Sequence, residues 1–170
     1  MRTITWDDEK QVVKMIDQRI LPHEFEILEF NHHRDVAEAI RSMVIRGAPA
    51  IGAAGAYGMA LAAHVSDAKT LDEIQAYLQD ASQVLIKARP TAVNLPWAVN
   101  RMLAALEDFS GSVDELRQYL LDLAKRIADE DVEINKRMAA YGAVLIEDGD
   151  HILHHCNTGA LATVDWGTAL

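Results

Sequence analysis

Residues 50–65 read AIGAAGAYGMALAAHV, a run in which nearly every side chain is small or aliphatic. The run has about 16 residues, fewer than the 20 or so that a helix needs to span a bilayer, and we therefore expect a buried helix. Gly52, Gly55 and Gly58 each cost about 1 kcal/mol relative to alanine inside a helix. Such a penalty is tolerable where a second helix or a backbone must come close.

Three short β-like segments precede this helix and predict a small antiparallel sheet. They cover residues 3–6, 11–16 and 24–30. From Arg34 onward the apolar spacing changes to three and four residues, which predicts a helix with one apolar face. That face would hold Val36, Ala39, Ile40, Met43 and Val44.

Two later helices are expected to begin at capping boxes, in which a hydroxyl and a carboxylate satisfy free N–H groups of the first turn. The two motifs are TLDE at 70–73 and SVDE at 112–115. The second helix is long, and its apolar stripe predicts packing against the earlier helices, with a coiled-coil partner as the alternative. The stripe consists of Leu116, Leu120, Leu123, Ile127, Ile134, Met138 and Leu145.

A polar turn at 147–150 precedes an apolar run at 151–156 that is expected to be a strand. We place a domain boundary at this turn, so that residues 1–149 form an α+β domain with a small antiparallel sheet and a helical bundle. One strand and a short segment after it cannot bury both of their faces. A second domain is therefore expected to begin at residue 150 and to remain incomplete at residue 170.

The composition narrows the class of protein. The chain has 170 residues, half of them apolar, and a formal charge of −10. This charge argues against a protein that coats nucleic acid or an anionic membrane, because both require a basic face. A single cysteine, no charged-then-apolar leader and no apolar run near 20 residues predict a soluble, cytoplasmic protein.

Cys156 is the only cysteine, so it cannot form an intrachain disulfide. A small buried hydrophobe is the ordinary role of such a residue, but the polar turn that follows favours a reactive thiol. Asn157, Thr158 and the amides around Gly159 can hydrogen-bond a developing oxyanion. We expect no metal here, because in an extended strand His154 and Cys156 share one face and His155 lies on the other.

Two arginine motifs are candidate phosphate sites. Arg46 stands beside Gly47, Ala48 and a proline at the expected start of the helix, where backbone N–H groups and a guanidinium can bind an anion. Spacing alone favours an ordinary interhelical turn. Arg89, in the link between two helices, is either a second phosphate clamp or a cation placed against the negative end of the preceding helix.

Four ordered segments of the chain form a recognisable set. They are IDQ with LP at 16–22, MVIRGAPAIG at 43–52, RPTAVNL at 89–95, and HCNTGALAT at 155–163 followed by GTAL at 167–170. Together these segments resemble the methylthioribose-1-phosphate isomerases, which are similar in fold to the regulatory subunits of the initiation-factor-2B exchange factor. The resemblance implies an aldose-to-ketose rearrangement of a sugar phosphate in methionine salvage, without a cofactor. It implies substrate binding by Arg46, Gly47, Ala48 and Arg89, and Cys156 as the catalytic thiol.

The resemblance also implies a Rossmann-like second domain that carries further catalytic residues and forms a homodimer, and only its first strand would fall within residues 150–170. We therefore expect a truncated or split enzyme, inactive without the other half. A non-catalytic regulatory module related to the initiation-factor-2B subunits is one alternative. A ribose-1,5-bisphosphate isomerase is the other.

Overall fold

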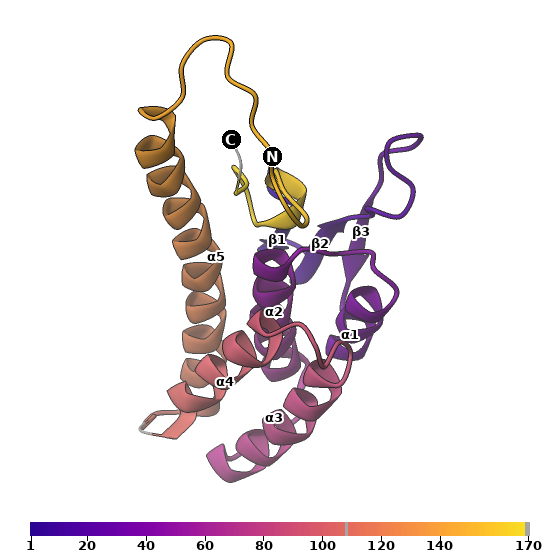
Figure 1. Cartoon of the computed structure of the whole chain (residues 1–170). Coiled ribbons are helices and arrows are strands. Elements are labelled where there is room, and N and C mark those ends of the chain that lie inside the picture. The colour runs from indigo at the N-terminus through magenta and orange to yellow at the C-terminus, as the bar shows by residue number, and fades with distance from the viewer. Residues whose placement is uncertain (108, 169–170) are drawn as a thin grey trace.

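The computed structural model describes residues 1–107 and 109–168, and within them the chain has an α+β fold (Figure 1). Three strands come first, followed by a series of helices. The elements are β1 (Ile4–Asp7), β2 (Val12–Ile16), β3 (Ile27–Phe30), α1 (His33–Arg41), α2 (Ala48–Val65), α3 (Leu71–Ile86), α4 (Asn94–Glu107), α5 (Val113–Ala143) and the 3₁₀ turn η1 (Ala160–Ala162).

The sheet is an antiparallel meander in the order β1-β2-β3, as predicted. Ile4 pairs with Met15 and Val13 with Phe30. Side chains alternate between the two faces of a strand, and those of Ile4, Trp6, Val13 and Met15 are buried in the core shared with the helices. The sheet therefore covers one side of the helical layer.

Helix α2 is the centre of the fold, and every residue from Ala50 to Ala63 is buried. It contacts α1, α3, α4, α5 and the sheet (Figure 1). A Cβ on Gly55 would lie 2.7 Å from Leu95 Cδ1 of α4, and a Cβ on Gly58 would lie 2.8 Å from Leu85 Cδ2 of α3. The helix is buried as predicted, and its glycines allow two neighbouring helices to approach.

Both capping boxes are present. Thr70 Oγ1 accepts from the Glu73 amide and Ser112 Oγ accepts from the Glu115 amide, each at 3.2 Å. The glutamates in turn accept from the backbone of Thr70 and Ser112. These reciprocal bonds set the first residues of α3 and α5.

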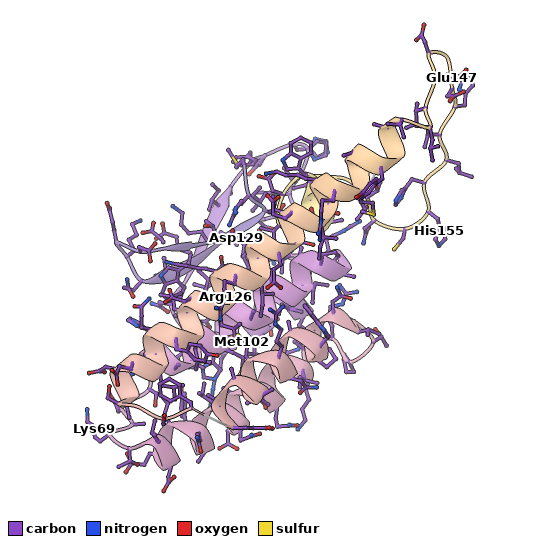
Figure 2. All side chains as sticks on the ribbon, turned by 90° about the vertical axis from the view of Figure 1, so that its left-hand side faces the viewer. Lys69, Met102, Arg126, Asp129, Glu147 and His155 are labelled. Carbon is purple, nitrogen blue, oxygen red and sulfur yellow. The ribbon has the colours of Figure 1, made fainter. Side chains whose placement is uncertain are left out.

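The apolar stripe predicted for α5 is confirmed only in its first half. Leu116, Leu120, Leu123 and Ile127 are buried. Ile134 is 51% exposed, Met138 is 45% exposed and Leu145 lies beyond the helix. The end of α5 and the loop that carries Glu147 and His155 extend past the rest of the domain (Figure 2). Ile134 and Met138 line an open cavity beside Trp97 and are therefore only partly covered.

Met43 was also predicted wrongly. Helix α1 ends at Arg41, and Met43 has a φ of +63° and an exposed side chain. Val44, one residue later, is buried as expected. A helical repeat carried two residues too far therefore placed Met43 on the wrong face.

The expected strand at 151–156 is not formed. All six residues are described and exposed, and they make no strand. A strand requires a neighbour for its backbone groups, and none of the described strands lies beside this segment. The chain instead returns to the domain through η1, where Ala162, Thr163 and Val164 are buried.

Two further findings concern the described residues. None of their helices is both long enough and apolar enough to cross a membrane. The GTAL motif at 167–170 is described only as far as Thr168, and its last two residues lie outside the described part of the chain.

Candidate functional site

The amino-terminal end of α2 has no side-chain cap. Gly47 is the N-cap residue, with a φ of +98°, and the first turn carries a proline and no acidic residue. The first N–H groups of a helix have no partner within it, and the aligned peptide dipoles make this end positive. The start of α2 is therefore suited to an anion.

The returning chain crosses directly over this helix start. A Cβ built on Gly47 would lie 2.4 Å from both Cα and the carbonyl oxygen of Ala162 in η1. A side chain at position 47 would therefore collide with backbone. Glycine is required here both for its positive φ and for this close approach.

Polar contacts from residues that flank β1 and β2 hold the returning chain in place. The Thr3 amide donates to the Val164 carbonyl at 2.9 Å, and Thr3 Oγ1 donates to the Ala160 carbonyl at 2.8 Å. Gln18 Nε2 donates to the Leu161 carbonyl at 2.8 Å. Nothing in the local sequence pattern signals these contacts, because they join opposite ends of the chain.

Two of the predicted motifs meet at this crossing. Arg46 Nη2 donates to Asn157 Oδ1 at 2.8 Å. The pair borders a cavity of about 250 Å³ in which Arg46 is the only charged lining residue among those described. The lining residues are Gln18, Leu21, Arg46, Asn157, Thr158, Leu161 and Ala162. A chain of net negative charge thus presents a local cation next to the positive end of a helix.

The other predicted site residues lie around this cavity without lining it. Cys156 is exposed, with a φ of +78°, and directly precedes Asn157. Gly159 also has a positive φ, of +77°, and is the N-cap residue of η1. Ala48 is exposed at the start of α2.

Arg89 lies in the link between α3 and α4 and does not line the cavity. The link reaches α2 at its end, where the Asn94 carbonyl would lie 3.2 Å from a Cβ on Gly52. The second arginine motif therefore comes close to the first turns of α2 through Asn94. Arg89 itself does not share the cavity that Arg46 lines.

A second cavity, of about 360 Å³, opens between α2, α4 and α5, on the side of Pro49 and Ala53. Its lining includes Trp97, Asn94 and the carboxylate of Asp131, whose pKa is raised by burial. Sequence reasoning did not single out Asp131. Among the described residues, no three His, Cys, Asp or Glu side chains are grouped as a metal site.

Comparison with known proteins places this geometry in a family. The Initiation factor 2 subunit family matches residues 44–165, a range that includes Arg46 and Asn157. Methylthioribose-1-phosphate isomerase 2 of Pseudothermotoga lettingae is 48% identical over 169 residues, which are 99% of this chain and 48% of that protein. Methylthioribose-1-phosphate isomerase of Thermosipho africanus is 44% identical, with 99% of this chain and 48% of that protein covered.

Two solved structures share the fold. The crystal structure of 5-methylthioribose 1-phosphate isomerase from Pyrococcus horikoshii has a TM-score of 0.90 and 47% identity. The match covers 98% of this chain and 46% of the isomerase chain. The translation initiation factor eIF-2B subunit delta from A. fulgidus has a TM-score of 0.86 and 47% identity, covering 98% and 48%. This chain spans about half the length of these relatives. It belongs to the initiation factor 2 subunit family.

Proposed function

We propose that this chain is the amino-terminal, substrate-binding half of a methylthioribose-1-phosphate isomerase. The observation that carries the proposal is the bond between Arg46 and Asn157 beside the uncapped start of α2. It brings two predicted motifs to one cavity, whose described lining residues carry a single fixed positive charge. The relatives that carry this activity in their names support the choice of substrate.

In this proposal the phosphate binds at the start of α2. The Arg46 guanidinium supplies charge-assisted hydrogen bonds, and the N–H groups of Gly47 and Ala48 supply neutral ones. Arg89 approaches from the neighbouring link as a second cation. The substrate is a 5-methylthioribose with phosphate on its anomeric carbon.

The reaction balances without an external oxidant. The ring C1–O bond breaks and the released ring oxygen takes up a proton, the hydrogen on C2 moves to C1, and the C2 hydroxyl gives up its proton to become the carbonyl of the 1-phosphoketose. No atoms or electrons are gained or lost overall, so no cofactor is required. Cys156 would be the thiol that assists this transfer, and Asn157, Thr158 and the amide of Gly159 would hydrogen-bond the developing oxyanion.

The rest of the enzyme would come from a complementary carboxyl-terminal half, because the relatives are about twice as long. We place its docking face on the exposed apolar side chains of Ile134, Met138 and Tyr141, near the end of α5. A Rossmann-like domain would begin near residue 150, where a neighbouring strand would bury Leu153, now 97% exposed, while Ala162 to Val164 stay packed on this half. A homodimer of complete enzymes and a cytoplasmic setting, where an exposed thiol stays reduced, belong to the same proposal.

Reconstitution of turnover tests the proposal. The purified chain is mixed with the carboxyl-terminal half of the Pyrococcus horikoshii isomerase, and conversion of 5-methylthioribose 1-phosphate is followed. We expect no turnover from either half alone and measurable turnover from the mixture. Robust turnover by this chain alone, or a stable complex that remains inactive on this sugar, would contradict the proposal.

A non-catalytic module is the second candidate, because the initiation factor subunit is similar in both fold and sequence. Such a module requires no affinity for a sugar phosphate. A related isomerase acting on ribose 1,5-bisphosphate would need a second phosphate clamp instead of an apolar pocket for the methylthio group. Titrating the reconstituted protein with both sugars distinguishes the three.

A further inference from the structure

Asp131 joins α5 to the returning chain. Its Oδ2 accepts from the Val164 amide at 2.8 Å. Val164 is completely buried, so its amide has no access to water as an alternative partner. A buried N–H without an acceptor is costly, and the Asp131 carboxylate satisfies it.

The other Asp131 oxygen is also occupied. Asn135, itself buried, donates from Nδ2 to Asp131 Oδ1 at 3.1 Å and to the Asp131 backbone carbonyl at 2.9 Å. Both neighbours of the carboxylate are therefore donors. A group with two acceptor oxygens suits this position, and burial of the side chain raises the pKa of Asp131.

Val164 lies between α5 and the sheet. Its amide donates to Asp131, while its carbonyl accepts from the Thr3 amide at 2.9 Å. Two residues earlier in the chain, Ala162 touches Gly47 at the start of α2. The bond from Val164 to Asp131 thus holds the same returning segment that packs on Gly47 through Ala162 and carries Asn157 to Arg46.

We infer that Asp131 is a positioning residue, which fixes the segment 159–166 against the start of α2 and so holds Asn157 beside Arg46. It acts through the backbone of Val164 and does not line the Arg46 cavity. The effect on the loop depends only on this contact. The consequence for phosphate binding rests on the proposed function.

The test compares amide hydrogen exchange and inorganic phosphate binding in Asp131→Ala, Asp131→Asn and the exposed control Glu133→Ala. In Asp131→Ala, amides of 160–166 should exchange about tenfold faster or more, with α2 and β2 unchanged, because only a local bond is lost. Phosphate affinity should fall with it. Asp131→Asn retains one acceptor oxygen and should restore most of the protection, and Glu133→Ala should match the wild type.

Two results would overturn the inference. One is equal exchange of 160–166 in Asp131→Ala and Glu133→Ala, and the other is an equal rise throughout α2, which would make Asp131 a general stabiliser. If the alanine variant does not fold, the wild type decides: its Val164 amide must exchange at least about tenfold more slowly than that of exposed Asn157. Absence of phosphate binding in the wild type would count against the proposed function alone, since the exchange data stand separately.

Discussion

Gly47 and Ala162 bring two stretches of backbone into close contact at the candidate site, where a Cβ on Gly47 would lie 2.4 Å from the Ala162 Cα. The contact joins the start of the central helix to the 3₁₀ turn near residue 160. It leaves room for no side chain at position 47. The site is therefore formed by backbone packing as much as by the side chains around it.

Gly47→Ala should destabilise the chain. An alanine at position 47 must keep a backbone φ of +98°, and its methyl group must displace Ala162. The backbone strain alone costs about 1–3 kcal/mol, before the collision is counted. Chemical denaturation measures the change. Gly142→Ala is the matched control, because it lies within α5 with no atom near the added methyl. A Gly47→Ala variant as stable as Gly142→Ala would show that the approach is not as close as described.

Local sequence patterns predicted the elements whose causes are local. The capping boxes, the three strands and the buried helix follow from residues within a few positions of one another. The apolar pair Ile152 and Leu153 misled because a strand needs a partner that no local pattern supplies. The bonds of Arg46 to Asn157 and Asp131 to Val164 were beyond reach for the same reason, since they depend on how distant segments pack.

His33 should make the stability of the chain depend on pH. Its side chain is 3% exposed, and burial, with smaller effects of His32 and Arg34, lowers its pKa from 6.5 to about 4. The folded state favours the neutral form of His33. The contribution of His33 to the free energy of unfolding is therefore fully present above pH 6.5, and it is lost as the pH falls from 6.5 toward 4. The loss over this range should be about 3 kcal/mol.

Unfolding free energies measured between pH 7 and pH 4 check this, with His33→Leu expected to flatten the profile over that range. The exposed His23→Gln should retain the wild-type slope. A slope in His33→Leu equal to that of the wild type would assign the pH dependence to other groups.

Cys156→Ser should separate chemistry from folding. The thiol is exposed and unpaired among the described residues, so the unfolding free energy should stay within about 0.5 kcal/mol of the wild type. Turnover of the reconstituted enzyme should be abolished, because a hydroxyl is a far weaker acid than a thiol. Preserved turnover would remove Cys156 from the reaction.

The central claim is that the start of α2, with Arg46, binds the phosphate of the substrate. Calorimetric titration of the chain with 5-methylthioribose 1-phosphate tests it most directly, in the wild type, in Arg46→Ala and in Arg41→Ala, whose arginine pairs with Glu38 on the surface. Loss of the charged hydrogen bonds should weaken binding about 10- to 150-fold, equivalent to about 1.5–3 kcal/mol, in Arg46→Ala only. Equal affinities in all three proteins would contradict the claim.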